Sequence, residues 1–363
     1  MKAKHRIAVI GDTRRGGYGH GLSLAGLQFD NAEVVAVADP DSTGLKQAIL
    51  ETGARQGYAD YQVMLQKEKF TLACVGPRWT DQREAMIYAC IDAGCNIYCE
   101  KPFARDLASA DRMLAAAKKA GVKIAVAHQA VYLPQIRQLR TMIHDGLIGE
   151  PQLVWLHGKQ GSRGGGEDML VLGCHQFNLL RFFFGQPQWM WSRIRQSGRE
   201  LASGDVHEAS EPVGPVAGDE IFGFYQFPGN LNAIYQSRCN PSDGGPSPYG
   251  IEIVGSRGRI AFDNNRAVIH RGGAWAPWST LANWTDLALG AFSLRDIGNR
   301  NAIVDLLMAI EKDQEPACDA KSVTTAMEMI FATYHSQIQG RRISFPLAQR
   351  EHPLDEFSLL TKI

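Results

Sequence analysis

The first third of the chain alternates short β-branched segments with amphipathic stretches of helical length, and this alternation constrains the fold more than any other feature. Strands that alternate with helices form a parallel sheet with helices on its faces. The strands are expected at residues 7–10, 34–38, 72–75, 96–99 and 123–127. The helices are expected at residues 19–27, 43–51, 82–93 and 107–120. Residues 1–127 are therefore predicted to form an α/β domain of the Rossmann type, with a doubly wound parallel sheet.

The pattern changes after a helix expected at residues 134–148, where longer alternating strands are joined by turns that contain Gly and Pro. The clearest hairpin joins residues 220–227 to residues 231–238 through Pro228-Gly229-Asn230. Further helices are expected at residues 168–184, 299–312 and 323–339. Residues 128–363 are predicted to form an α+β domain with a large, mostly antiparallel, open sheet. The loops at residues 209–217 and 240–248 are rich in Pro and Gly, and we expect them at an active-site rim or a subunit contact.

The charge balance and the cysteine spacing indicate which class of partner and which cellular compartment to expect. The chain has 38 basic and 38 acidic residues, so no long-range field attracts nucleic acid or an anionic membrane, and small-molecule partners are expected. Apolar runs are too short to span a bilayer, and no signal peptide is recognised. The seven cysteines lack paired metal or disulfide spacing, which predicts reduced thiols in the cytoplasm. The histidines show no HExxH pattern, so no metal is predicted.

A glycine-rich turn follows the first expected strand and is predicted to bind a dinucleotide. It runs from Gly11 to His20 and includes Thr13, Arg14 and Gly16. In a Rossmann unit such glycines let backbone NH groups approach a pyrophosphate at a helix N-terminus. Thr13 occupies the second glycine position of the GxGxxG pattern, so the turn could also be an ordinary glycine-rich loop.

Asp39 ends the second expected strand and favours NAD over its phosphorylated form. A carboxylate there accepts hydrogen bonds from a ribose diol and repels a 2'-phosphate. Two alternatives weaken the prediction: Asp39 could be an ordinary surface residue, and the guanidinium groups of Arg14 and Arg15 could bind that phosphate.

Glu100 and Lys101 follow the expected strand at residues 96–99, at the edge of an open α/β sheet where ligands bind. Adjacent buried charges are costly unless they pair or take part in chemistry. With Pro102 they form an EKP motif, and the chain resembles the Gfo/Idh/MocA family, named after glucose-fructose oxidoreductase, inositol dehydrogenase and a rhizopine catabolism protein. The motifs shared with that family, in chain order, are the glycine-rich turn, Gly76-Pro77-Arg78-Trp79, Glu100-Lys101-Pro102, His128-Gln129 and Gly173-Cys174-His175.

The resemblance implies a set of site residues. In the family the EKP lysine contacts both the substrate hydroxyl and the nicotinamide ribose, which gives these roles to Lys101. The residues implied to bind the cofactor in addition to those of the turn and Asp39 are Gly76, Pro77, Trp79, Glu100, Lys101 and Gln129. The residues expected to bind substrate are Lys101, His128 and His175, together with a dense polar set that flanks a run of three glycines beside the predicted sugar site, namely Lys159, Arg163, Glu167 and Asp168. For Glu167, a helix-capping role in a solvated loop is an equal alternative.

His175 is the second predicted catalytic residue, but its usual partner is missing. Family dehydrogenases carry Asp four residues before this histidine, whereas this chain has Val171, and Asn178 stands where a second Asp is common. Asp168 lies seven residues before His175, which returns it to the same face of an α-helix about 10 Å away along the axis. We therefore predict Asp168 as a catalytic stand-in that acts through a water or a substrate oxygen.

Three functions are compatible with these residues. The first is an NAD-dependent oxidoreductase that acts on a hydroxyl of a sugar, a polyol or a carbohydrate derivative. The second is a lyase or glycoside hydrolase that oxidises its substrate transiently and recycles a retained NAD. The third is a dinucleotide or sugar sensor without turnover. The resemblance also implies a homodimer or homotetramer formed through the C-terminal sheet.

Overall fold

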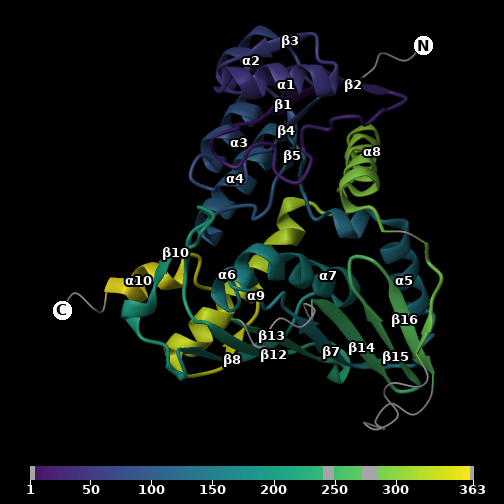
Figure 1. The fold of residues 1–363 in the computed structure, drawn as a ribbon, viewed down its shortest axis with the longest axis vertical. Coiled ribbons are helices and arrows are strands. Elements are labelled where there is room, and N and C mark those ends of the chain that lie inside the picture. Colours follow the sequence, from purple (N-terminus) through teal and green to yellow (C-terminus); the bar gives the residue numbers. More distant parts are fainter. Residues whose placement is uncertain (1–4, 240–248, 272–283, 291, 360–363) are drawn as a thin grey trace. The chain divides into compact units, whose positions relative to one another are not determined.

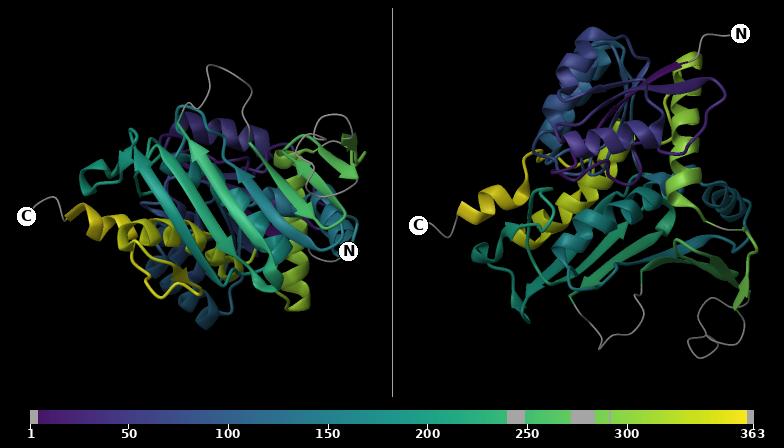
Figure 2. Two further views of the ribbon diagram at one scale, coloured as in Figure 1. Left: turned by 90° about the horizontal axis from the view of Figure 1, so that it is seen from below. Right: turned by 45° about the horizontal axis from the view of Figure 1, so that its top comes forward.

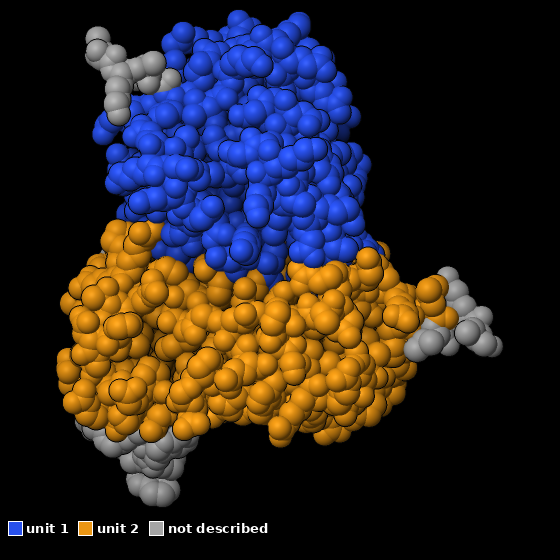
Figure 3. Space-filling model, turned by 180° about the vertical axis from the view of Figure 1, so that it is seen from behind, with its two compact units in different colours: residues 1–132, 210–214, 293–324 blue, residues 133–209, 215–292, 325–363 orange. Residues whose placement is uncertain are grey.

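The computed structural model describes residues 5–239, 249–271, 284–290 and 292–359, so the loop expected at 240–248 lies outside the described residues. The chain divides into two compact units (Figure 3). Unit 1 comprises residues 1–132, 210–214 and 293–324, and unit 2 comprises residues 133–209, 215–292 and 325–363. These units differ from the expected division after residue 127, because residues 293–324 return to unit 1. The hydroxyl of Tyr98 donates to Oδ1 of Asn299 at 2.8 Å, and the backbone N–H of Cys318 donates to the hydroxyl of Tyr132 at 3.1 Å.

Unit 1 contains a six-stranded, all-parallel sheet with the strand order β3-β2-β1-β4-β5-β6 (Figure 1). Its strands are β1 (His5–Ile10), β2 (Ala32–Ala38), β3 (Gln56–Tyr58), β4 (Leu72–Val75), β5 (Asn96–Cys99) and β6 (Ile124–Val126). Strand β4 is buried along its whole length, as expected for a sheet covered on both faces. The predicted parallel sheet is confirmed, whereas the short strand β3 was not predicted.

Three of the described helices of unit 1 begin at an aspartate that caps their first turn. The helices of this unit are α1 (Ser42–Thr52), α2 (Tyr61–Lys67), α3 (Arg83–Asp92), α4 (Leu107–Ala120) and α8 (Asn299–Lys312). The side chain of Asp41 accepts hydrogen bonds from the first backbone N–H groups of α1, and Asp106 caps α4 in the same way. Gly53 ends α1 with φ 70°, a left-handed conformation that glycine adopts without strain.

The helix expected at residues 19–27 is absent, and that prediction is wrong. The segment between β1 and β2 consists of turns. Its backbone has φ of 57° at Gly19, 92° at Gly21, 61° at Leu24 and 70° at Gly26. Repeated left-handed residues cannot continue a right-handed helix. A helix N-terminus is therefore not available after the glycine-rich turn.

Unit 2 is built on a large, mostly antiparallel sheet with the strand order β17-β16-β15-β14-β7-β13-β12-β8-β18, and β9 pairs with β8. Only the pairing of β13 with β7 is parallel along this path among the described residues. Its strands are β7 (Pro151–His157), β8 (Trp189–Gln196), β9 (Arg199–Glu200), β12 (Glu220–Gln226), β13 (Asn232–Arg238), β14 (Gly250–Gly255), β15 (Gly258–Phe262), β16 (Ala267–Arg271), β17 (Trp284–Asp286) and β18 (Ile343–Ser344). A separate two-stranded ladder joins β10 (His207–Glu208) to β11 (Pro215–Val216).

The helix expected at residues 168–184 consists of three segments. A short turn α6 (Gly166–Asp168) leads into a π-helix (Met169–Gly173), which continues as α7 (Cys174–Phe184). A π-helix holds more residues per turn than an α-helix. The same-face argument for Asp168 and His175 assumed a regular α-helix, so it does not apply to this segment.

Helices cover one face of the large sheet. The remaining helices of unit 2 are α5 (Pro134–His144), α9 (Ala320–Gln339) from residue 325 onward, and α10 (Pro353–Leu359). Phe177 of α7 packs on Tyr225 and Tyr235, and Thr333 of α9 bonds to the hydroxyl of Tyr225 at 2.6 Å. The opposite face is seen in Figure 2 (left). Trp191 of β8 and Phe222 of β12 are exposed, as expected for side chains that alternate with the buried ones along each strand.

Candidate active site

A cavity of about 460 Å³ lies at the carboxyl ends of the first strands in unit 1, within the usual size of a ligand pocket. It is lined by Gly11, Asp12, Ala38, Asp39, Pro40, Ala59, Asp60, Tyr61, Gln82 and Met86. Two of these residues, Gly11 and Asp39, were predicted to bind the cofactor. The position at the ends of β1 and β2 is where open α/β sheets hold a dinucleotide.

Asp39 is fully buried, and its carboxylate already holds the glycine-rich turn. It accepts the backbone N–H of Thr13 at 3.1 Å and the Thr13 hydroxyl at 2.7 Å. It also accepts the backbone N–H of Asp41 at 2.9 Å. Thr13, which interrupts the glycine pattern, is therefore explained by its partner. Asp39 can disfavour a phosphate through its charge, although most of its hydrogen-bonding capacity is in use.

The two arginines of the turn are each paired with a carboxylate. Arg14 contacts Asp41 at 2.8 Å, and Arg15 pairs with Asp81 while its guanidinium lies 5.2 Å from the centre of the Trp79 ring. These carboxylates offset the positive charge of the two guanidinium groups, which would otherwise attract a 2'-phosphate.

Tyr18 lies against the glycines of the turn, and sequence reasoning missed it. A Cβ at Gly11 would overlap the Tyr18 ring, and a Cβ at Gly76 would lie 3.0 Å from Tyr18 Cα. Burial, together with the nearby Asp39, raises the pKa of Tyr18 far above its ordinary value, so the hydroxyl stays protonated. These glycines thus let Tyr18 approach the backbone closely. Nothing in the sequence pattern of the turn indicates that a tyrosine of the same segment fills this space.

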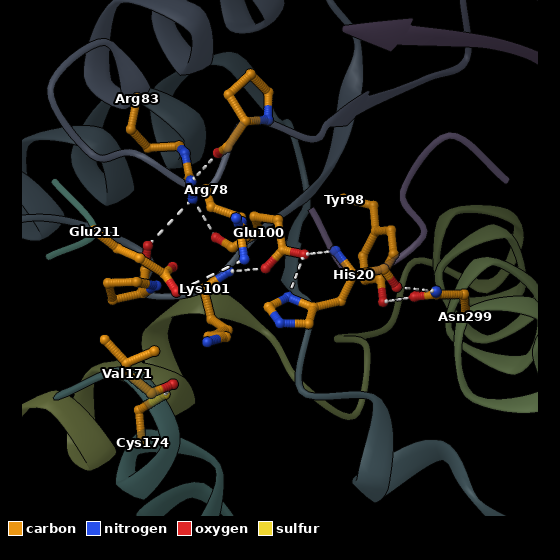
Figure 4. A network of polar contacts seen from close by, with 12 residues as sticks. His20, Arg78, Arg83, Tyr98, Glu100, Lys101, Val171, Cys174, Glu211 and Asn299 are labelled. Carbon is orange, nitrogen blue, oxygen red and sulfur yellow. Dashed lines mark hydrogen bonds and ion pairs between the residues drawn. The ribbon is translucent and has the colours of Figure 1, made fainter. Parts of the chain in front are cut away.

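Glu100 and Lys101 follow β5 directly, as predicted, and both are buried (Figure 4). The Glu100 carboxylate accepts the backbone N–H of His20, His20 Nδ1 at 2.9 Å and the backbone N–H of Lys101 at 2.9 Å. Burial alone would raise the pKa of Glu100, but the His20 and Lys101 charges and hydrogen bonds outweigh it and hold the pKa below its usual range. The glutamate is therefore ionised at neutral pH.

Arg83, at the start of α3, joins the EKP motif to the second predicted cofactor loop, and no sequence pattern signalled this role. Its side chain is almost completely buried. Nη1 donates to the carbonyl oxygens of Glu100 and, at 3.1 Å, Pro102, while Nη2 donates to the carbonyl of Pro77 at 2.5 Å. One guanidinium group thus binds the backbone on both sides of Lys101.

The Pro-rich loop predicted at residues 209–217 contacts the loop that contains Gly76 and Pro77. Within unit 1, Glu211 lies 3.7 Å from Arg78, and the backbone N–H of Thr80 donates to Pro212 at 3.0 Å. The predicted placement at an active-site rim stays a prediction, although its neighbour is a predicted cofactor loop.

His128 and Gln129 follow β6 and are both buried. The side-chain Nε2 of Gln129 has no hydrogen-bond partner among the described residues. A buried amide donor left without a protein partner is a group that a bound ligand can satisfy. Together with the cavity, it shows that the residues present fit a dinucleotide, although the phosphates would meet a turn and not a helix N-terminus.

In unit 2, Asp168 is buried and tied to the loop before it. Its Oδ2 accepts the Ser237 hydroxyl at 2.6 Å and the Gln160 backbone N–H at 3.3 Å, whereas Oδ1 has no partner in the described chain. Ser237 in turn accepts the backbone N–H of Gly165 at 2.9 Å. Burial raises the pKa of Asp168 despite these bonds. The contacts attach the carboxylate to β13 and the loop, not to His175.

The other predicted residues of unit 2 lie along the same segment. Arg163 and Glu167 form an i,i+4 contact of 3.5 Å, and Lys159 belongs to the loop that Asp168 holds. His175 is half-buried in the first turn of α7, and Val171 is buried in the π-helix. Across the described part of the chain, no cluster of three or more His, Cys, Asp and Glu side chains has metal-binding geometry, and no helix has the length and hydropathy needed to cross a membrane.

Comparisons with known proteins match the chain in sequence and in fold. The profile described as "Oxidoreductase family, NAD-binding Rossmann fold" matches residues 5–128, and that of the "GFO/IDH/MocA C-terminal domain" matches residues 136–261. A D-apiose dehydrogenase of Paraburkholderia graminis is 29% identical over 348 residues, covering 90% of this chain and 86% of the relative. A myo-inositol 2-dehydrogenase of Thermotoga maritima is 25% identical over 272 residues, covering 72% and 76%. The fold matches an oxidoreductase from Agrobacterium radiobacter solved with NAD+, L-tartaric acid and magnesium, with a TM-score of 0.73, 16% identity, and coverage of 94% of this chain and 98% of the other.

Proposed function

Because the chain belongs to the GFO/IDH/MocA family of NAD-binding oxidoreductases, we propose that it transfers hydride between NAD and a hydroxyl-bearing carbon of a sugar, a polyol or a carbohydrate derivative. The observation that carries this proposal is the buried polar scaffold around Lys101, at the carboxyl end of β5. The names of the apiose and inositol dehydrogenases support a carbohydrate hydroxyl as the reacting group.

Each predicted catalytic residue has a proposed task. NAD, when bound, supplies the hydride acceptor. Lys101 donates a hydrogen bond to the substrate hydroxyl oxygen, and His175 takes the hydroxyl proton during oxidation. The task assigned to Asp168 is to favour the protonated imidazole through a water or a substrate oxygen, while its Oδ2 accepts the Ser237 hydroxyl.

The remaining site residues divide between the two ligands. We assign substrate contacts to His128, Lys159, Arg163 and Glu167, whose polar side chains suit the hydroxyls of a carbohydrate. We assign cofactor contacts to the turn and the following loops, namely Gly11, Thr13, Arg14, Gly16, Asp39, Gly76, Pro77, Trp79, Glu100 and Gln129.

We also propose a preference for NAD over NADP. The negative charge of Asp39 disfavours a phosphate in the cavity, and the carboxylates of Asp41 and Asp81 occupy the arginines that would attract it. Dissociation constants for the two dinucleotides, measured by titration calorimetry, test the preference. Tighter binding of NADP would contradict it.

A second candidate is the lyase or hydrolase that recycles its NAD. Val171 favours it, because a buried valine stands where family dehydrogenases place a carboxylate beside the histidine. Oxidation next to a C–H bond makes that bond acidic, elimination follows, and return of the hydride restores the cofactor. Product would then form without net accumulation of NADH.

One experiment separates these functions and tests Lys101. The purified protein is analysed for retained dinucleotide and is screened with sugars, polyols and glycosides by product analysis and NADH absorbance together. Lys101→Ala is expected to lower turnover at least a hundredfold while NAD still binds. Lys123→Ala, which breaks a 3.0 Å contact with Asp313 in the same unit, is the control and should keep turnover. NAD binding with no product from any substrate would favour a sensor, and normal turnover of Lys101→Ala would remove this lysine from the mechanism.

Assembly and compartment complete the proposal. We propose a homodimer or homotetramer formed through the open sheet face, supported by its exposed Trp191 and Phe222. The mass in solution, from light scattering, tests it. The seven cysteines form no disulfide with one another in the described chain, which supports a reducing, cytoplasmic compartment.

A further inference from the structure

We propose that His20 is a positioning residue for Lys101 and that it acts through the carboxylate of Glu100. The proposal rests on the proposed function, in which Lys101 contacts the substrate. It assigns a task to His20, the last residue of the glycine-rich turn, which is not among the proposed cofactor contacts.

The carboxylate of Glu100 is surrounded by donors from two segments of unit 1. Oε1 accepts both the backbone N–H and ring Nδ1 of His20, the latter at 2.9 Å. Oε2 accepts the backbone N–H of Lys101 at 2.9 Å. A carboxylate only accepts hydrogen bonds when ionised, so its contact with Nδ1 requires the imidazole proton on that nitrogen.

These donors determine where the charge of Glu100 is compensated. Its side chain is fully buried, and a buried charge must be paired or hydrogen-bonded. Without His20, the ammonium of Lys101, whose charge already acts on Glu100, would be drawn into an ion pair with this carboxylate. Figure 4 shows the Lys101 side chain extending away from the Glu100 carboxylate. His20 therefore keeps the lysine side chain directed away from the Glu100 carboxylate.

The position of His20 is itself fixed by the fold. Its carbonyl accepts Nδ2 of Asn299 at 2.9 Å, and Oδ1 of Asn299 accepts the Tyr98 hydroxyl at 2.8 Å. A Cβ at Gly19 would overlap the Glu100 carboxylate, so glycine at that position allows the turn to approach it. The His20 side chain is 31% exposed, so thermal unfolding of the His20→Ala variant has to be measured beside its activity.

The test compares His20→Ala, His20→Asn, Glu100→Gln and the double variant His20→Ala/Glu100→Gln. His5→Ala is the matched control, because His5 also contacts a glutamate, Glu311, at 3.0 Å in the same unit. Each protein is measured for kcat and KM, for NAD affinity, and for the rate at which acetic anhydride acetylates Lys101, followed by mass spectrometry without substrate. Thermal unfolding checks that each variant is folded.

His20→Ala is expected to lower kcat and the Lys101 acetylation rate about tenfold each, with NAD affinity within about twofold of the native value. His20→Asn, which keeps a donor, should recover part of both. The double variant should acetylate Lys101 faster than His20→Ala alone, because the neutral amide introduced by Glu100→Gln no longer attracts the ammonium. His5→Ala should change neither quantity.

Two results would overturn the proposal. If folded His20→Ala keeps both the acetylation rate of Lys101 and the kcat of the native protein, His20 does not position the lysine. This conclusion would hold even where Lys101→Ala confirms the proposed function. A large loss of NAD affinity in His20→Ala would assign the residue to cofactor binding. If instead Lys101→Ala keeps turnover, the proposed function fails, and the acetylation rates still decide whether His20 controls Lys101.

Discussion

The two units hold their predicted catalytic residues in different ways. In unit 1, Lys101 lies in a scaffold made of other motif residues and their direct partners, since Glu100 binds its backbone and Arg83 binds the carbonyl on either side. In unit 2, Asp168 bonds to Ser237 and the preceding loop, and a π-helix separates it from His175. The lysine is thus positioned by its motif, whereas the aspartate is positioned by a strand the motif does not include.

This difference shows when a sequence pattern predicts that two residues lie close together in space. Residues of a short motif at a strand end are neighbours in the fold because they are neighbours in the chain. A seven-residue spacing predicts proximity only while the helix stays regular. The carboxylate of Asp168 therefore suits a structural role in the loop, and the first prediction separates that role from catalysis.

The largest expected effect distinguishes His175 from Asp168. His175→Ala should lower kcat/KM by a factor of about 100 to 10,000, as expected for loss of a general base. Asp168→Asn should lower it less than tenfold, because asparagine can still accept the Ser237 and Gln160 hydrogen bonds. His144→Ala, an exposed histidine of α5, is the control and should retain full activity. Equal losses of kcat/KM in His175→Ala and Asp168→Asn would show that the two residues act together in catalysis. The two units would then not differ in the way described.

The next effect concerns the scaffold of unit 1. Arg83→Met leaves the carbonyls of Pro77, Glu100 and Pro102 without their donor, and the free energy of unfolding should fall by about 3 kcal/mol. Urea denaturation measures the change. Arg112→Met, which removes an exposed contact with Glu84, should cost less than about 1 kcal/mol. If the two variants lose equal stability, Arg83 does not hold the two loops together.

The smallest effect is a pH dependence that belongs to unit 2. Burial raises the pKa of Asp168 above its unfolded value, so the folded protein binds the proton more tightly. The resulting stabilisation is complete below the unfolded pKa and is lost as pH rises through the folded pKa. Native protein should therefore lose stability relative to Asp168→Asn over that interval in urea titrations at several pH values. A parallel pH dependence of the two proteins would show that Asp168 is not buried in the way described.

Much of the fold could be predicted, because strands buried on both faces have an unmistakable apolar pattern. The sheet of unit 1 and the hairpin of β12 and β13 are confirmed close to their expected bounds. The helix expected at residues 19–27 failed because Leu24 adopts φ 61°, a conformation that nothing in an apolar leucine indicates. The π-helix was not predicted either, because its apolar sequence is equally compatible with an α-helix. Its wider turn changes which side chains share a face.

The site was predictable to the extent that it depends on local motifs. Glu100 and Lys101 lie where their strand predicted, and Asp39 follows β2 as expected. Arg83 and Tyr18 were missed because their tasks arise from contacts with distant loops, and each looks ordinary in its own segment. Whether the predicted residues act in catalysis stays a prediction until the variants are measured.

The return of residues 293–324 to unit 1 has a consequence for biosynthesis. Tyr98 and Tyr132 find their partners Asn299 and Cys318 only after unit 2's first strands have been synthesised. At typical translation rates, roughly 10 to 40 s separate these parts of unit 1 at the ribosome. During that interval unit 1 lacks α8, whose buried side chains include Ile303, Leu306 and Leu307, and a fragment ending at residue 132 would lack them permanently. We expect such a fragment to bind chaperones or to aggregate, because the apolar surface that α8 covers would stay exposed.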